Sequence, residues 1–519
     1  MNLSIFKIYT AANDWSAIAP EIMLSLSAIS LLIFDILIFN KKSNASNITI
    51  IAISIVFIIS LLNLANNTNI KPFYCFSGLL RQDIFTQFMR LFFLISSFLT
   101  AYFSNVYLRK YKIIHTEYYV ILLIVTAAIM LAIQSNDFIM LFISLETSAI
   151  GFYILITYFK DECSLKSGLK YLILSGISAA IMLFGIILLY GIAGSQKFLP
   201  ATSVSPFNYD IIQYCLSFNS NITLNYNIKN YFHLSSLFVL CGIFFKIGVV
   251  PFQVWIPEVY KSVSTPITAL LNVSSKISGI FILLNLIQGP FKNIVEFITP
   301  LLSFIAITTI IYGNFAALSE RNVKCLIGLS GITQTGYMLL GIISFIKEQS
   351  YALPILLFYF LAYLLGSFSV FSVIIYNSKS LYAFQEVKDF KGFSSQEPFL
   401  AIVLTVGLCS LGGIPPFIGF ISKFLIIILA YKANVYPVLL IVVFLGIVLS
   451  TYYYFNWIRE IFFSTWQNQK NNFENKEISN QIKLNFLDYI ILTILVLLIL
   501  ILGVYQGPIG KYITSYFAQ

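Results

Sequence analysis

Long apolar runs follow one another along this 519-residue chain, separated by short polar stretches. A helix needs about 20 mainly apolar residues to cross the hydrocarbon core of a membrane. With that window, the pattern predicts an all-α polytopic membrane protein with about fourteen transmembrane helices. They lie near residues 17–39, 48–65, 88–107, 117–135, 137–159, 167–194, 234–256, 265–288, 293–312, 321–345, 351–377, 398–430, 434–463 and 486–506.

No polar stretch between these helices is long enough to form a soluble domain, so residues 1–519 are predicted to be a single membrane domain. Four segments follow from the order of the helices. They are 1–116 with helices 1–3, 117–288 with helices 4–8, 293–463 with helices 9–13, and 464–519 with a loop and helix 14.

Proline interrupts two of the predicted helices. Helix 7 contains Pro251 in FKIGVVPFQVW, and helix 12 contains GGIPP, from Gly412 to Pro416. A proline inside a helix removes a backbone hydrogen bond and clashes with the preceding turn. A simple kink would explain one such helix, but two broken helices five spans apart are typical of inverted-repeat transporters. Because five is odd, helices 4–8 and 9–13 would run in opposite directions, as two inverted five-helix repeats require.

The composition supports a membrane protein. The chain is 59% hydrophobic and only 10% charged, with a mean hydropathy of +0.88, whereas soluble domains carry about 25% charged residues. The net charge of +10 does not indicate nucleic acid here, because most lysines and arginines flank apolar runs and act as topology signals. We interpret Arg321 and Lys324, at the start of helix 10, in this way. The scattered cysteines have no CxxC spacing and there are only two histidines, so we expect no metal, haem or cluster site.

Five ionisable residues lie inside otherwise apolar predicted helices: Glu146, Lys170, Lys246, Lys276 and Lys423. A charge at mid-membrane costs roughly 3 kcal/mol on insertion scales, so such groups almost always pair with one another or face water. They are typical of ion and proton paths. Irregular backbone at membrane depth also needs protein or water partners, so the GGIPP break predicts a hydrated pocket close to Lys423.

Each of these residues also has a purely structural explanation. Glu146 can be a neutral acid hydrogen-bonded to another helix, and Lys276 can be satisfied by neighbouring serine hydroxyls. Lys423 and Lys170 can snorkel toward an interface, Lys170 most easily because it is closest to a helix end. A pair of Glu146 and Lys246 favours function instead. Burial disfavours an ammonium and a nearby carboxylate stabilises it, so separating the pair would release a proton and closing it would reload the lysine.

Longer stretches around these residues resemble a known family. They are LETSAIGFYIL around Glu146, SGLKYLIL around Lys170, FKIGVVPFQVWIPEVYKSVSTPITALL from Phe245, RNVKCLIGLSGITQTGYMLLG at 321–341, and LGGIPPFIGFISKF at 411–424. The sequence resembles the antiporter-like membrane subunits of proton-pumping NADH:quinone oxidoreductase, which is respiratory complex I. Among them it is most similar to NADH dehydrogenase subunit 2, called subunit N in bacteria.

The resemblance implies a proton-translocating subunit, part of a translocase whose electron transfer takes place elsewhere in the complex. It implies that the glutamate of helix 5, Glu146, pairs with the lysine of helix 7, Lys246. The path would continue through Lys276 in helix 8 and Lys423 in helix 12. There are departures: Gln253 and Gln334 stand where the family often has histidine, and Lys261 replaces a usual acid. Glutamine cannot titrate, which puts an essential protonation at those two positions in doubt.

The same resemblance implies the surroundings of the chain. No cofactor is expected in this chain, whereas NADH, FMN, iron–sulfur clusters and quinone are expected in other subunits. The expected partners are the neighbouring antiporter-like subunit 4, the small subunit 4L and lipid. We expect a multi-pass inner-membrane protein. The mitochondrial inner membrane is favoured, since abundant Ile, Phe, Asn, Lys and Tyr are typical of A+T-rich genomes, and the bacterial plasma membrane is the alternative.

Three other functions stay open at this point. A cation/proton antiporter subunit of the multisubunit sodium/proton type shares the motifs and is the closest alternative. A sugar or drug transporter would present converging polar side chains in one substrate cavity, whereas this chain repeats single titratable residues. A structural scaffold with non-functional charges is the last, and neutralising the lysines would test it.

Overall fold

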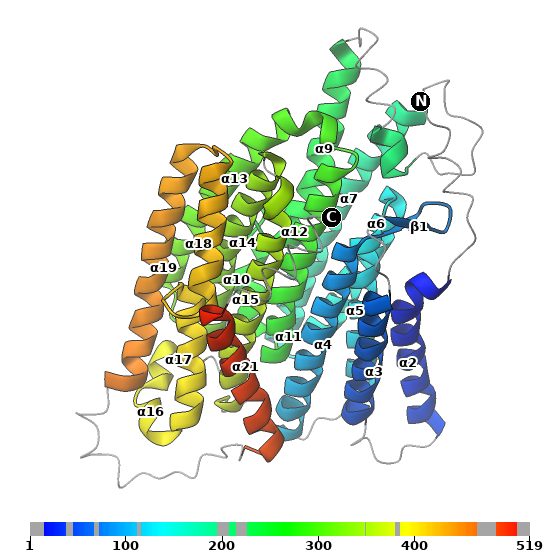
Figure 1. Cartoon of the computed structure of the whole chain (residues 1–519). Helices are drawn as coiled ribbons and strands as arrows, with labels where there is room; N and C mark the ends of the chain where they lie inside the picture. The colour runs from blue at the N-terminus through cyan, green and yellow to red at the C-terminus, as the bar shows by residue number, and fades with distance from the viewer. Residues whose placement is uncertain are drawn as a thin grey trace. The chain divides into compact units, whose positions relative to one another are not determined.

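The computed structural model describes residues 15–37, 45–66, 72–111, 116–194, 207–213, 226–347, 349–378, 385–463 and 484–505. These residues are almost entirely helical (Figure 1). Within them, 13 helices are long and apolar enough to cross a membrane. The prediction of an all-helical polytopic membrane protein is therefore confirmed.

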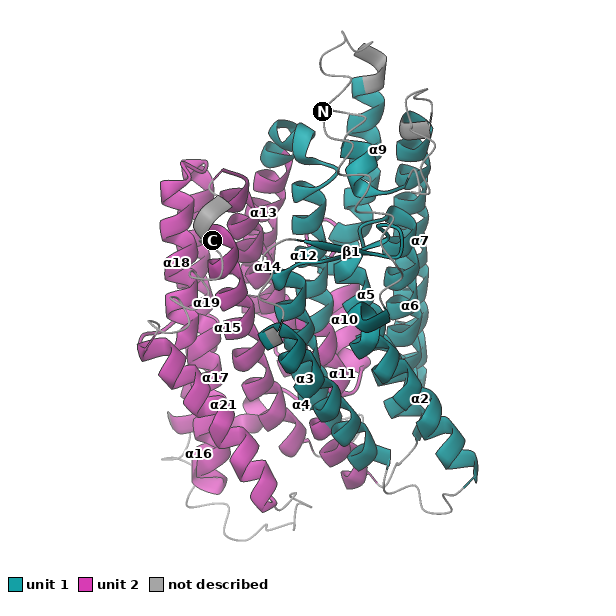
Figure 2. Cartoon of the chain, turned by 45° about the vertical axis from the view of Figure 1, so that its right-hand side comes forward, with its two compact units in different colours: residues 1–101, 114–247, 274–300 teal, residues 102–113, 248–273, 301–519 magenta. Residues whose placement is uncertain are grey.

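The chain divides into two compact units, coloured teal and magenta in Figure 2. Unit 1 consists of residues 1–101, 114–247 and 274–300, and unit 2 of residues 102–113, 248–273 and 301–519. The chain passes from one unit to the other at several places. Two of them lie directly after α9 and between the third and fourth residues of a π-helical segment described below, and both coincide with irregular backbone.

Unit 1 holds most of the N-terminal helices. They are α2 (Ala19–Leu37), α3 (Ala45–Asn66), most of α4 (Ile84–Lys110), α5 (Thr116–Gln134), α6 (Phe138–Ile156), α7 (Glu162–Gly194), α9 (Tyr226–Ile247) and α12 (Lys276–Gln288), with the short helices η1 (Trp15–Ile18) and η4 (Lys292–Ile294). Here α5 packs against α2 and α6, and α7 against α9. Gly185 allows the last contact, because a Cβ there would lie 2.8 Å from backbone atoms of Ser235 and Val239.

A small β-hairpin in unit 1 was not predicted. Strands β1 (Phe73–Cys75) and β2 (Leu80–Gln82) pair antiparallel, with Phe73 opposite Gln82 and Cys75 opposite Leu80. Cys75 and Leu80 are buried together with Ala17. The strands are three residues long, too short for the alternating pattern that identifies a strand in a sequence.

Unit 2 holds the remaining helices. They are α10 (Trp255–Ser262), α11 (Thr265–Leu270), most of α13 (Val295–Ser319), α14 (Val323–Lys347), α15 (Gln349–Tyr376), η5 (Val387–Phe390), α16 (Phe393–Gln396), α17 (Pro398–Gly412), α18 (Ile418–Lys432), α19 (Pro437–Phe463) and α21 (Phe486–Val504). In this unit α15 packs against α14, α17 and α18.

Both predicted helix breaks are confirmed. α9 ends at Ile247, and the chain resumes as a helix only at α10, after Gly248 with a φ of +74° and Pro251. α17 ends at Gly412, and α18 begins after both prolines of GGIPP. Gly413, with a φ of +82°, ends α17 in the left-handed conformation that glycine adopts most easily.

A third irregularity corrects the prediction of one continuous helix over 265–288. Leu271–Ser275 form a π-helical turn between α11 and α12, although Thr265–Gln288 together remain long enough to span a membrane. Single π-helical turns inside α-helices are frequent at functional sites. Lys276 is the first residue after this turn.

Candidate functional site

Lys246 and Glu146 are brought together in unit 1. Asp137 caps the start of α6 by accepting a hydrogen bond from the Ile139 amide at 2.8 Å. Lys246, one residue before the end of α9, is only 9% exposed, and its Nζ donates a hydrogen bond to the Leu145 carbonyl at 3.2 Å. Glu146 follows Leu145 directly and is half-buried, and its carboxylate lies near enough to act electrostatically on the Lys246 ammonium.

Lys276 is fully buried on a neighbouring segment of the same unit. The Ser275 hydroxyl donates a hydrogen bond to the backbone carbonyl of Lys246 at 3.2 Å, which holds the start of α12 against the end of α9. Gly279 permits this approach, because a Cβ there would lie 2.6 Å from Cγ1 of Ile247. The hydroxyls of Ser274 and Ser96 lie 2.9 Å apart and hydrogen-bond to each other.

Lys170 differs from the other predicted residues because it is exposed on α7. The next residue, Tyr171, is buried and lies near enough to Glu146 for an electrostatic interaction. α7 therefore turns Tyr171 toward the neighbourhood of Glu146 and Lys170 toward its surface.

Lys423 in unit 2 binds the carbonyls left free where α17 ends. Its Nζ donates to the Leu411 carbonyl at 2.7 Å and to the Gly412 carbonyl at 3.2 Å. The last carbonyls of a helix have no partner within the helix and carry its negative dipole end, so they stabilise a cation. Nζ also lies 5.3 Å from the ring centre of Tyr337.

A small cavity lies beside Lys423. Measured over the positions open to the centre of a water molecule, its volume is about 10 Å³, which is room for about one water. Its polar lining consists of Gln334, Tyr359, Tyr363, Ser410, Ser422 and Lys423. A pocket therefore lies beside Lys423, as expected, and its hydration stays a prediction.

Gln334, which stands where the family often has histidine, takes part in this region through both ends of its amide. Its Nε2 donates to the Leu411 carbonyl at 3.1 Å, and its Oε1 accepts from the Tyr359 hydroxyl. Gln334 and Lys423 thus share one backbone carbonyl. Gln253, the other such position, is buried in the break after α9, and its Oε1 has no hydrogen-bond partner among the described residues.

Lys324 corrects our interpretation of a topology signal. It is buried, and its Nζ donates to the carbonyl of Val263 at 2.8 Å, where α10 ends. Arg321 beside it is exposed, as a flanking charge should be. Lys261, which replaces an acid of the family, forms an ion pair with Glu320 at 3.3 Å.

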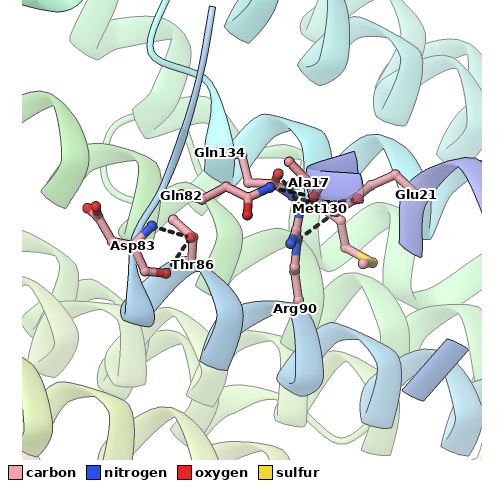
Figure 3. A network of polar contacts seen from close by, with 8 residues as sticks. All are labelled: Ala17, Glu21, Gln82, Asp83, Thr86, Arg90, Met130 and Gln134. Carbon is pink, nitrogen blue, oxygen red and sulfur yellow. Dashed lines mark hydrogen bonds and ion pairs between the residues drawn. The ribbon is translucent and has the colours of Figure 1, made fainter. Parts of the chain in front are cut away.

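Arg90 and Glu21 form a buried charged cluster that the sequence analysis missed (Figure 3). Arg90 Nε lies 2.8 Å from Glu21 Oε1, and Nη2 lies 3.2 Å from Oε2. Gln134 joins both: it accepts from Arg90 Nη2 and donates to Glu21 Oε1, each at 2.5 Å. Arg90 Nη2 also donates to the Ala17 carbonyl at 2.6 Å. The cluster links η1, α2, α4 and α5, and its network of buried hydrogen bonds indicates a structural role.

In the described ranges, no three or more His, Cys, Asp or Glu side chains are grouped so that they could hold a metal ion.

A helical membrane fold with broken helices and buried lysines is typical of membrane proteins that move ions or protons. The family model described as NADH:quinone oxidoreductase/Mrp antiporter matches residues 135–450. The chain is 39% identical over 521 residues to NADH-quinone oxidoreductase subunit N 1 of Opitutus terrae, covering 99% of this chain and 100% of that protein. It is 30% identical over 451 residues to subunit N of Paramagnetospirillum magneticum, covering 87% and 88%.

The fold is similar to a chain in the structure of respiratory complex I from Thermus thermophilus, with a TM-score of 0.73 and 21% identity, covering 95% of this chain and 98% of that one. This chain belongs to the subunit N family, the multi-pass membrane subunits of proton-translocating NADH:quinone oxidoreductase. It is part of that complex together with other subunits. Both relatives are bacterial, so the expected mitochondrial placement is not supported.

Proposed function

We propose that protons cross the membrane on the buried ionisable groups of this subunit. Glu146 and Lys246 act as the switch, Lys276 is the next relay group, and Lys423 acts at the outlet end. One observation carries the proposal. The Lys246 ammonium donates a hydrogen bond to the carbonyl of Leu145, the residue directly before Glu146.

Two positions of different energy are open to the Lys246 ammonium. Movement toward Glu146 gains attraction between opposite charges in a medium of low dielectric. Movement away leaves a buried ammonium without a counter-charge, which favours loss of its proton. A change in the distance between α6 and α9 therefore couples conformation to proton release.

Lys276 is assigned the next step because its helix begins against the end of α9, where Ser275 binds the Lys246 carbonyl. The serine hydroxyls around the π-helical turn both donate and accept hydrogen bonds, so they suit a proton relay. Lys423 is assigned the outlet end because the break between α17 and α18 provides a water-sized cavity beside it. Lys170, exposed on α7 beside the buried Tyr171, is assigned to the same path.

The finer architecture and surroundings belong to the same proposal. α17 and α18 together make one further crossing, which gives fourteen crossings with two inverted five-helix repeats. The neighbours are the antiporter-like subunit 4 and the small subunit 4L, and the membrane is the bacterial plasma membrane. NADH, FMN, iron–sulfur clusters and quinone bind to other subunits.

A cation/proton antiporter is the second candidate function, because the matching family model is also described by the Mrp antiporter. The full-length match to subunit N favours the first function. Pumping that depends on sodium ions rather than on protons would favour the second.

The test is Lys246→Met in the assembled complex, with protons pumped per electron and turnover both normalised to the amount of complex. We expect coupled turnover to fall at least tenfold, since proton transfer by a positioned group contributes typically 10²–10⁴-fold. Lys166→Met on exposed α7 surface is the matched control. Wild-type stoichiometry and turnover in the Lys246 variant would exclude Lys246 as the switch.

A further inference from the structure

Ser410 faces the cavity beside Lys423 from the last turn of α17. It is 1% exposed, lines the cavity, and its Oγ has no hydrogen-bond partner among the described residues. Buried hydroxyls almost always have a partner in the protein or an ordered water. Gly419 brings the first turn of α18 against this serine, because a Cβ at Gly419 would lie 3.1 Å from Ser410 Oγ.

The other polar groups around the cavity already donate elsewhere. The Ser422 hydroxyl donates to the Gly419 carbonyl at 3.0 Å, and the Tyr363 hydroxyl donates to the Asn272 carbonyl at 3.2 Å. The Tyr359 hydroxyl donates to Gln334. A water in the cavity would therefore receive its hydrogen bond from Ser410 or from Lys423, and it would find acceptors in the tyrosine oxygens. A stable buried water needs two to four such partners.

The two carbonyl partners of Lys423 leave one site of its Nζ without a partner in either protonation state. Its ammonium has three N–H donors, and two of them bind the Leu411 and Gly412 carbonyls. A neutral amine keeps two N–H groups that can donate to these carbonyls, but its lone pair accepts a hydrogen bond only from a donor, which a carbonyl cannot supply. If Lys423 carries protons, it must spend part of each cycle neutral, and a hydroxyl that can turn toward it then supplies the donor for its lone pair.

We propose that Ser410 and one water molecule in this cavity together form a hydrogen-bond partner for both states of Lys423. When Lys423 is neutral, the Ser410 hydroxyl donates to the water and the water donates to the amine. When Lys423 is an ammonium, the water accepts from it. Ser410 is thus a positioning residue for Lys423. This inference rests on the proposed proton-carrying role of Lys423.

The other titratable groups that face Lys423 are tyrosines, which leaves Ser410 and the water to control the protonation of Lys423. The titratable residues around it are Tyr337 on α14, Tyr359 and Tyr363 on α15, and Tyr454 on α19, which packs against Gly412. In the described part of the chain, no carboxylate acts on Lys423. The neutral state therefore depends on hydrogen-bond donors rather than on nearby charges.

The test compares Ser410→Ala with Ser422→Ala in the assembled complex, and measures protons pumped per electron and turnover across pH. Ser422 lines the same cavity but already binds Gly419, which makes its variant a matched control. We expect Ser410→Ala to lower turnover about three- to tenfold at neutral pH, the effect of one lost hydrogen bond, and to move the pH profile toward higher pH. The reason is that the neutral amine loses its donor. Ser410→Thr keeps the hydroxyl and should restore the profile.

A second measurement locates the water directly. Density for one water between Ser410 Oγ and Lys423 Nζ in a high-resolution structure of the complex supports the inference, and an empty cavity overturns it. A Ser410→Ala profile equal to that of Ser422→Ala overturns it as well. If Lys423→Ala abolishes pumping in the same assay, equal profiles of the two serine variants exclude the role of Ser410 but leave that of Lys423 intact. If Lys423→Ala pumps normally, the role of Lys423 itself is wrong.

Discussion

Arg90 and Glu21 form a buried ion pair with two contacts, Nε to Oε1 at 2.8 Å and Nη2 to Oε2 at 3.2 Å. The two residues are only 4% and 3% exposed and come from different helices of unit 1. Removal of one partner would leave the other as an uncompensated buried charge, whereas removal of both would leave none.

The first prediction is that Arg90→Met and Glu21→Leu each destabilise the subunit, by about 3–5 kcal/mol, whereas the double variant recovers a large part of this loss. Thermal unfolding of the purified complex and the amount of assembled complex would measure it. Arg81→Met is the control, because its pair with Asp83 at 2.8 Å is partly exposed and such pairs contribute about 0–1 kcal/mol. Equal losses in the single and double variants would contradict a coupled pair.

The second prediction concerns Glu146. Glu146→Gln keeps the size of the side chain and one acceptor oxygen but removes the charge that attracts the Lys246 ammonium. We expect assembled complex with turnover reduced at least tenfold, because Lys246 can no longer be reloaded by closing the pair. The measurement is the number of protons pumped per electron in proteoliposomes.

The control for this prediction is Glu162→Gln, at the exposed start of α7. Normal pumping by Glu146→Gln would show that the Lys246 ammonium needs only the Leu145 carbonyl.

The sequence predicted a backbone feature correctly where the residues that cause it lie within that feature. Proline and glycine act on their own backbone, so Pro251 and Gly412 to Pro416 predicted both helix breaks correctly. The π-helical turn at Leu271–Ser275 contains neither residue, and nothing in LNVSS distinguishes it from an ordinary helical segment. The presence of this turn directly before Lys276 could therefore be recognised only from the structure.

The sequence also failed to predict which charged residues near helix ends are buried. Lys324 and Arg321 are three residues apart and have the same sequence context, yet Lys324 is buried on the Val263 carbonyl and Arg321 is exposed. The difference arises because α10 ends against α14, a contact between segments 61 positions apart in the chain. A long apolar helix can be recognised from a sequence, but the partner that another helix brings to a buried charge cannot.

The third prediction follows for Lys324. Lys324→Met removes the cation from the last carbonyls of α10, which typically contributes about 0.3–1 kcal/mol and up to ~2 kcal/mol in buried geometry. We expect a lower thermal unfolding temperature and less assembled complex, with an unchanged number of protons pumped per electron. Arg321→Met, at the exposed neighbouring position, should change neither quantity. A reduced pumping ratio in Lys324→Met would instead place this lysine in the proton path.

The fourth prediction distinguishes two replacements of Lys423. Alanine removes the group that donates to the Leu411 and Gly412 carbonyls, so Lys423→Ala should lose coupled pumping. Glutamic acid can donate to one of these carbonyls, but only when it is protonated, because an ionised carboxylate only accepts hydrogen bonds. Lys423→Glu should therefore retain partial pumping, more at pH 6 than at pH 8.

The measurement for this prediction is the number of protons pumped per electron at both pH values, normalised to assembled complex. Lys432→Ala, at the exposed end of the same helix, controls for the loss of a positive charge from α18. Since both lysine and protonated glutamic acid can donate to the two carbonyls of α17 and alanine cannot, the order wild type, glutamate, alanine should hold at pH 6. A glutamate variant that pumps better at pH 8 would show that water in the cavity, and not these carbonyls, holds the group at position 423.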